Sequence, residues 1–183
     1  MSASGPFNTA EQTKAPWVER AAICCDMLEP LVVSGRIRTV ADIGCGDRKL
    51  MRLMEERGWG VSYRGFDIMP QAEDVEPLDL NLVAPPGNSD AAIALGLLEY
   101  VDDIAACMRR LADHAPVLVV SHTVRDGEIY DERQIRERGW KSHLYADEFV
   151  ELLGTNGWQV VDSRATADAR TRIWLAQRSR SGA

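Results

Sequence analysis

The chain has 183 residues, of which 45% are hydrophobic and 27% are charged, so it is long enough to bury a core and has an ordinary globular composition. Its 28 acidic and 21 basic residues give a formal net charge of −7, which disfavours partners with a phosphate backbone such as nucleic acids. No run of about 18 apolar residues occurs, so no membrane-spanning segment is expected.

The N-terminal segment and the cysteines indicate which cellular compartment to expect. Residues 1–15 are polar and rich in Ser, Thr, Gly and Pro, which predicts a flexible arm and not a signal peptide. The cysteines have neither disulfide-framework nor metal-ligand spacing (Cys24, Cys25, Cys45 and Cys107). We therefore expect buried thiols in a reducing cytoplasm, no metal site, and one domain over residues 16–183.

The first half of the domain alternates between helix and strand patterns. Pro16 opens a helix expected at 17–31, and a β-branched run predicts a strand at 37–43 that ends at a glycine-rich turn. A helix at 49–57 and a strand at 61–66 follow. The proline-rich stretch 68–89 is expected to be loop.

The second half continues the alternation. We expect a strand at 91–95, a helix at 103–114 that ends in a solvated His114, a buried strand at 116–121 and a helix at 146–153. The basic stretch 133–141 is interpreted as a solvated helix face. Two strands close the chain, at 158–162 and 172–176.

This order predicts an α/β fold with one doubly wound, mostly parallel sheet and helices on both faces. The two closing strands have no helix between them. They can therefore be joined only as a hairpin, and the last strand should run antiparallel to the rest.

The central motif consists of two acidic residues, Asp42 and Asp67, and two glycines, Gly44 and Gly46. Gly44 and Gly46 follow the first strand closely, and such glycines let a chain turn sharply and let a ligand approach the backbone. Asp67 lies 21 residues after Gly46, at the end of the next strand. Because parallel strands end at one edge of a sheet, Asp67 should lie beside the glycine turn and accept the hydroxyls of a ribose.

These motifs resemble class I S-adenosylmethionine-dependent methyltransferases with a Rossmann-like fold, over residues 36–178. The stretch 42–46, Asp-Ile-Gly-Cys-Gly, resembles the motif that holds the methionine part of the cofactor, and Asp67 matches the ribose-binding acid. The stretch 78–81 resembles the adenine-binding segment, and 90–101 the fourth-strand motif. The resemblance implies S-adenosylmethionine as cofactor and these contacts for it: Asp42, Gly44, Cys45, Gly46, Asp67, Ile68, Asp79, Leu80 and Leu95.

Two residues depart from the family pattern. Arg48 stands where the family often has a third glycine, so it would crowd the carboxylate end of the cofactor or pair with it. Tyr100 replaces a frequent histidine; with an ordinary pKa near 10 a tyrosine is a poor base at neutral pH. Tyr100 is therefore expected to form a wall of the acceptor pocket.

The acceptor side is expected in an insertion at 122–145. His143 is the first candidate for a catalytic base and His122 is the second, because a hydroxyl acceptor must lose its proton. Trp140 is a candidate apolar wall of the same pocket, together with Tyr100. Acidic residues at 126–132 are interpreted as an exposed loop and not as a metal site.

The predicted reaction is methyl transfer to a small molecule, most simply O-methylation of a sugar, glycan precursor or secondary metabolite. The alternatives are a small-molecule N-methyltransferase and a non-catalytic cofactor-binding partner. The motif used on flipped nucleic-acid bases is absent from the fourth strand. A monomer and a homodimer both remain open.

Overall fold

A computed structural model describes residues 15–126 and 130–179. The arm expected at 1–15 lies, apart from Ala15, outside the described residues. The strands are β1 (Thr39–Ile43), β2 (Ser62–Asp67), β3 (Val75–Pro77), β4 (Ala91–Ala94), β5 (Val117–Thr123), β6 (Trp158–Ala165) and β7 (Thr171–Arg178). The helices are α1 (Ala15–Val33), α2 (Lys49–Glu56), α3 (Ile104–His114), α4 (Glu132–Glu137) and α5 (Ala146–Thr155).

All seven strands form one sheet in the order β3-β2-β1-β4-β5-β7-β6. The neighbours from β3 to β5 are parallel, whereas β7 runs antiparallel to both β5 and β6. The expected doubly wound sheet with an antiparallel last strand is confirmed. The chain moves outward in opposite directions from β1 and β4, and ligands bind at such a switch point in open α/β sheets.

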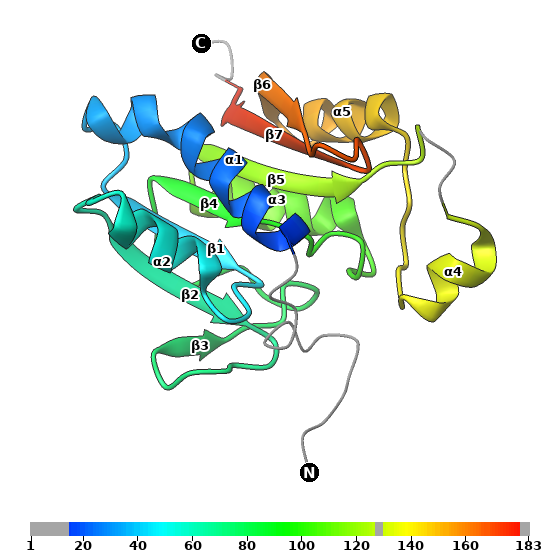
Figure 1. The fold of residues 1–183 in the computed structure, drawn as a ribbon, viewed down its shortest axis with the longest axis horizontal. Coiled ribbons are helices and arrows are strands. Elements are labelled where there is room, and N and C mark those ends of the chain that lie inside the picture. The colour runs from blue at the N-terminus through cyan, green and yellow to red at the C-terminus, as the bar shows by residue number, and fades with distance from the viewer. Residues whose placement is uncertain (1–14, 127–129, 180–183) are drawn as a thin grey trace.

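Helices cover both faces of the sheet (Figure 1). Helices α1 and α2 lie on the face toward the viewer, and α3 and α5 lie behind it. Each face has its own buried cluster, because the central strands are apolar on both sides. On the rear face Phe149 stacks on Trp174 with ring centroids 4.5 Å apart. Helix α4 stands away from the sheet, at the side toward which β5 points.

Three details differ from the sequence-based expectations. The stretch expected to be loop contains β3, a short edge strand that pairs with β2. Strand β5 continues to Thr123 because β7 pairs along its whole length. His114 is buried, not solvated: its Nδ1 lies 2.9 Å from the Gly87 carbonyl oxygen and its Nε2 lies 3.2 Å from the Ser89 hydroxyl.

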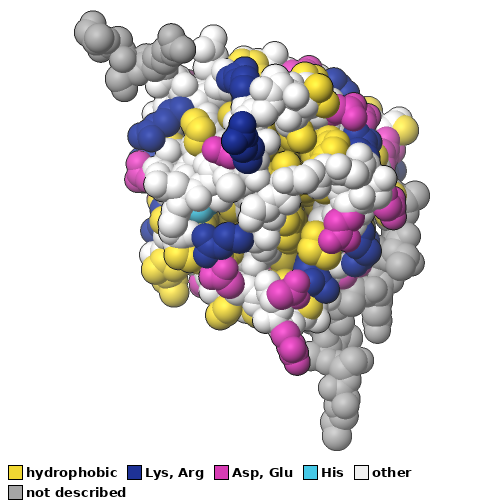
Figure 2. All heavy atoms as spheres, turned by 90° about the vertical axis from the view of Figure 1, so that its left-hand side faces the viewer, with side chains coloured by type: hydrophobic (Ala, Val, Ile, Leu, Met, Phe, Trp, Pro, Cys, Tyr) yellow, Lys and Arg dark blue, Asp and Glu magenta, His cyan; other side chains and the backbone are white. Residues whose placement is uncertain are grey.

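The surface carries mixed charge at the amino ends of the parallel strands, the left side of Figure 1. There Lys and Arg side chains are interspersed with Asp and Glu (Figure 2). Among the described residues, no helix combines the length and apolar character needed to cross a bilayer.

Candidate cofactor and acceptor sites

The turn after β1 brings the glycines against the end of β2. The backbone N–H groups of Gly44 and Cys45 both donate to the Phe66 carbonyl oxygen, at 2.8 and 3.0 Å. Gly44 has φ +74°, and a Cβ atom there would lie 3.2 Å from Leu97. The backbone conformation therefore favours glycine at this position, and a side chain there would require Leu97 to shift.

Asp67 lies at the tip of β2, directly beside this turn. Its Oδ2 accepts a hydrogen bond from Gly46 N and its Oδ1 accepts one from Met69 N, both at 2.9 Å. The side chain is largely buried but reaches a cavity. An ionised carboxylate has about four acceptor positions, so two backbone bonds fix Asp67 and leave capacity for a ligand's hydroxyls.

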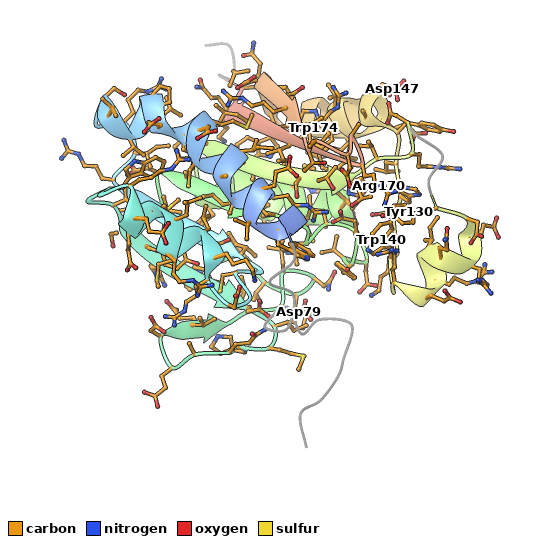
Figure 3. The ribbon with its side chains drawn as sticks, in the orientation of Figure 1. Asp79, Tyr130, Trp140, Asp147, Arg170 and Trp174 are labelled. Atoms are coloured by element: carbon orange, nitrogen blue, oxygen red, sulfur yellow. The ribbon has the colours of Figure 1, made fainter. Side chains whose placement is uncertain are left out.

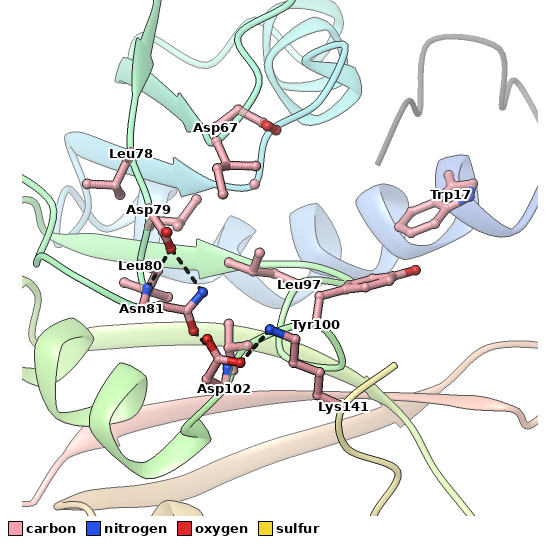
Figure 4. Close-up of a pocket in the computed structure, with 15 residues that line it drawn as sticks. Trp17, Asp67, Leu78, Asp79, Leu80, Asn81, Leu97, Tyr100, Asp102 and Lys141 are labelled. Atoms are coloured by element: carbon pink, nitrogen blue, oxygen red, sulfur yellow. Dashed lines mark hydrogen bonds and ion pairs between the residues drawn. The ribbon is translucent and has the colours of Figure 1, made fainter. Parts of the chain in front are cut away.

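A cavity of about 310 Å³ opens over the tips of β1, β2 and β4 (Figure 4). We call it the strand-tip cavity. Asp79 is held in its wall, because its Oδ1 accepts from Asn81 N at 2.9 Å and from Asn81 Nδ2 at 3.0 Å. Asp102 and Lys141 form an ion pair at the rim. Its lining residues include Trp17, Gly44, Asp67, Ile68, Asp79, Leu80, Asn81, Gly96, Leu97 and Tyr100.

A smaller cavity of about 50 Å³, the glycine-loop cavity, adjoins it at Trp17 and Gly44. Asp42 lies in its wall, and burial raises the pKa of this carboxyl to about 7, although a hydrogen bond from the Tyr63 hydroxyl (2.7 Å) favours the ionised form. The wall also includes Cys45, Gly46, Asp47, Lys49 and Leu95.

A third cavity of about 400 Å³, the polar cavity, meets the strand-tip cavity at Trp17, Gly96 and Tyr100. Gly96 has φ +66°, and a Cβ atom there would lie 2.5 Å from the Trp17 ring and 2.8 Å from Arg20 Nη1. Only glycine lets these side chains close over the junction. The other lining residues are Glu99, Thr123, Tyr130, Arg138, Trp140, Asp168, Arg170 and Thr171.

A family model described as a methyltransferase domain matches residues 17–163. The chain belongs to this methyltransferase family. No curated protein matches it. The methyltransferase family and the fold are those that the sequence predicts.

Solved structures share the fold at low sequence identity. The 1,6-didemethyltoxoflavin N1-methyltransferase of Burkholderia thailandensis, with its acceptor and S-adenosylhomocysteine bound, is 17% identical (TM-score 0.69; 93% of this chain, 81% of that one). Magnesium protoporphyrin IX methyltransferase of Synechocystis PCC 6803, with S-adenosylhomocysteine, is 22% identical (TM-score 0.66; 88% and 84%).

An O-methyltransferase from neocarzinostatin biosynthesis, with S-adenosylhomocysteine and 1,4-dihydroxy-2-naphthoic acid, is 16% identical (TM-score 0.62; 86% of this chain). This chain spans only 56% of that enzyme. It also spans 57% and 56% of two other matched chains, TnmH and the pyocyanin biosynthetic protein PhzM.

All nine residues expected to contact the cofactor line the first two cavities. The strand-tip cavity has Gly44, Asp67, Ile68, Asp79 and Leu80 in its wall, and the glycine-loop cavity has Asp42, Gly44, Cys45, Gly46 and Leu95. Arg48 turns away from both. It adopts left-handed backbone geometry (φ +62°) and pairs with Asp74 at 2.5 Å, so it neither crowds these cavities nor lines them.

The residues expected to form acceptor walls line a cavity, whereas the two histidines expected to act as bases do not. Tyr100 and Trp140 both line the polar cavity. His122 lies within β5 and not in the insertion where it was expected; it is fully buried and stacked on Phe149, with ring centroids 4.9 Å apart. His143 packs against Trp140 and Tyr130 with both ring nitrogens buried. Burial lowers the pKa of both imidazoles, and neither lines a described cavity.

Glu99 is the polar group that sequence reasoning did not assign. It is 1% exposed and lines the polar cavity. Its Oε1 accepts from Thr123 N at 2.8 Å, whereas Oε2 is buried without a hydrogen-bond partner among the described residues. The signal in the sequence was the Leu-Glu pair after β4, but only the fold shows that this carboxylate faces a cavity.

Arg20 comes to the same cavity from the first turns of α1. Its guanidinium lies 4.4 Å from the Trp17 ring centroid and donates to the Thr171 hydroxyl at 2.7 Å. Burial lowers the pKa of Arg20, and Glu99 opposes that shift. An arginine keeps its charge in proteins, so the polar cavity holds a part-buried cation and a buried carboxylate.

Within residues 15–126 and 130–179, no group of three or more His, Cys, Asp or Glu side chains is arranged to hold a metal ion. The four cysteines are buried and unpaired with one another. Burial raises the pKa of the Cys45 thiol, so it lines the glycine-loop cavity as a neutral group.

Proposed function

We propose that this chain transfers the methyl group of S-adenosylmethionine to the oxygen of a small-molecule acceptor. The single observation that carries the proposal is the joining of the strand-tip cavity to a separate polar cavity at Trp17, Gly96 and Tyr100. A cofactor in one and an acceptor in the other would meet at this junction.

The adenosine half of the cofactor fits the strand-tip cavity. Asp67 would accept hydrogen bonds from the ribose hydroxyls, and Asp79 from the adenine amino group, beside Leu80. The methionine tail would enter the glycine-loop cavity, with its ammonium group near Asp42. Buried carboxylates are suited to this cationic ligand, because the ligand's charge offsets their desolvation.

In the transfer, the acceptor oxygen forms a bond to the methyl carbon while the carbon–sulfur bond breaks. The sulfur keeps the electron pair and leaves as the neutral thioether, S-adenosylhomocysteine. We infer that the acceptor's proton passes to Glu99 Oε2, in place of the histidine base that the sequence predicts. Glu99 supports this role because it lines the polar cavity, whereas His122 and His143 do not.

Walls formed by Trp17, Tyr130 and Trp140 favour a ring-shaped acceptor over a flexible one. The solved neighbours with acceptors bound, the toxoflavin and neocarzinostatin enzymes, also hold ring compounds. N-methylation of an amine in the same cavity is the alternative. The toxoflavin enzyme, named for its N1 methylation, supports it.

The cofactor assignment is tested by calorimetry with S-adenosylhomocysteine. Asp67→Asn should weaken binding about tenfold or more, because it removes charge from hydrogen bonds to the ribose. Asp74→Asn, at an exposed acid outside the cavities, is the matched control and should bind as the wild type does. Equal affinities for the wild type and Asp67→Asn would refute the proposed cofactor site.

The activity is tested by following S-adenosylhomocysteine release with a panel of small hydroxylated and amino-substituted ring compounds. Turnover with phenolic or alcoholic members supports O-methylation, and turnover with amines alone supports the alternative. Tight cofactor binding without turnover on any member would favour a non-catalytic partner.

A further inference from the structure

The polar cavity carries more guanidinium groups than carboxylates, although the chain as a whole is acidic. Its charged lining residues are Arg20, Arg138, Arg170, Glu99 and Asp168. Arg170 Nε lies 3.8 Å from Asp168 Oδ2. Burial lowers the pKa of Arg20, and Glu99 acts electrostatically on Arg20 to raise it. Arg138 makes no ion pair with any of the described residues, and the lining has three guanidinium groups against two carboxylates.

Arg138 and Arg170 both stack on aromatic rings. The Arg138 guanidinium lies 4.5 Å from the Tyr130 centroid and 5.4 Å from that of Trp140, and Arg170 lies 5.9 Å from Tyr130. Figure 3 shows Arg170, Tyr130 and Trp140 together beside α4. Stacking fixes the plane of a guanidinium and leaves its N–H edge available for a planar anion.

The cavity therefore has two different ends. At the inner end, Trp17, Gly96 and Tyr100 are shared with the strand-tip cavity. At the outer end, Arg138 and Arg170 meet the edge-to-face pair of Tyr130 and Trp140, whose centroids are 5.1 Å apart. A flat molecule lying along the cavity would place one edge at the junction and the other at the arginines.

We propose that the polar cavity binds an aromatic carboxylate, with its ring among the aromatic walls and its carboxylate on Arg138 and Arg170. The inference rests on the proposed function, because the reacting hydroxyl of the ring then lies at the inner end beside Glu99. Arginine binds a carboxylate with two parallel hydrogen bonds, which gives both affinity and orientation.

The test uses the full chain saturated with S-adenosylhomocysteine and two calorimetric probes, 6-hydroxy-2-naphthoate, whose hydroxyl and carboxylate lie at opposite ends of the ring system, and its neutral amide. The carboxylate should bind about tenfold or more tightly than the amide, because a charge-assisted pair is replaced by neutral hydrogen bonds. Arg138→Gln and Arg170→Gln should each remove most of this preference. Both variants should leave the affinity for S-adenosylhomocysteine unchanged.

Arg133→Gln is the matched control, since Arg133 is a highly exposed residue of α4 outside the cavity. It should retain the full preference. Equal binding of carboxylate and amide, or an unchanged preference in both cavity variants, overturns the inference. Failure of both probes to bind overturns it too. If S-adenosylhomocysteine itself does not bind, the proposed function fails first, so the two failures are distinguishable.

Discussion

The proposed cofactor side and the proposed acceptor side of this molecule are built by different means. On the cofactor side, backbone groups and short acids at adjacent strand tips form the walls, and hydrogen bonds between neighbouring strands fix them. On the acceptor side, long side chains converge from α1, from the turn after β4, from the segment around α4 and from the β6–β7 hairpin.

This difference has a physical consequence. A site made by backbone at a strand tip is positioned by the sheet itself, so its geometry costs little additional side-chain ordering. A site made by arginines and aromatic rings must immobilise long side chains, each with considerable rotamer entropy. We therefore expect most substitutions on the cofactor side to weaken cofactor binding. Substitutions on the acceptor side should instead change which acceptor is preferred.

The largest effect is expected from Glu99→Gln. The glutamine keeps an oxygen to accept from Thr123 N but loses the base at Oε2, so kcat should fall by about 10²–10⁴-fold. Affinity for S-adenosylhomocysteine should stay the same. Steady-state kinetics with the best acceptor of the panel provides the measurement.

Glu137→Gln is the control for this prediction, because Glu137 is an exposed residue of α4 away from the cavity. Its kcat should match that of the wild type. A decrease of less than about threefold in Glu99→Gln would show that the acceptor's proton goes elsewhere.

Gly96→Ala should damage both sides at once, because Gly96 lies at their junction. Positive φ costs an alanine about 1–2 kcal/mol, and the new methyl group would collide with Trp17 and Arg20. We expect a loss of stability together with weaker S-adenosylhomocysteine binding, on the order of tenfold. Urea unfolding and calorimetry measure the two effects.

Gly58→Ala separates strain from crowding. Gly58 has a similar φ of +70°, but nothing lies within 4 Å of the Cβ position there. It should lose a similar amount of stability to backbone strain and keep wild-type cofactor affinity. If both variants bind the cofactor equally well, the junction is not where the two sites meet.

The acidity of Asp42 should make cofactor binding depend on pH. Its pKa is raised to about 7 by burial, so the carboxyl is increasingly neutral as pH falls below 7. A neutral acid pairs poorly with the ligand's ammonium. Affinity for S-adenosylmethionine should therefore fall as pH decreases below 7, by up to about tenfold per pH unit.

Two controls sharpen this prediction. Methylthioadenosine lacks the amino-acid tail, so its affinity should be nearly independent of pH over the same range. Tyr63→Phe removes a hydrogen bond that favours the ionised carboxylate, so the inflection should move to higher pH. A flat profile for S-adenosylmethionine between pH 5.5 and 7 would contradict the placement of its ammonium near Asp42.

The same contrast explains what could be predicted from the sequence. Asp67 and Gly44 were predictable because strand ends meet at one edge of a parallel sheet. The edge strand β3 was not, since three residues ending in proline carry no recognisable strand pattern. Arg20 was not predictable as a cavity residue either, because it reaches Thr171 across 151 positions of the chain.

The smallest effect is expected from His143→Gln. The imidazole packs against Trp140 at 5.5 Å and Tyr130 at 6.0 Å, and burial lowers its pKa, so it is a neutral spacer behind the cavity wall. We expect kcat to change by less than about twofold. The acceptor KM should rise modestly, because Trp140 loses a packing partner. If kcat instead falls by about 100-fold or more and one limb of its pH profile disappears, His143 is the base. The acceptor side would then extend beyond the polar cavity.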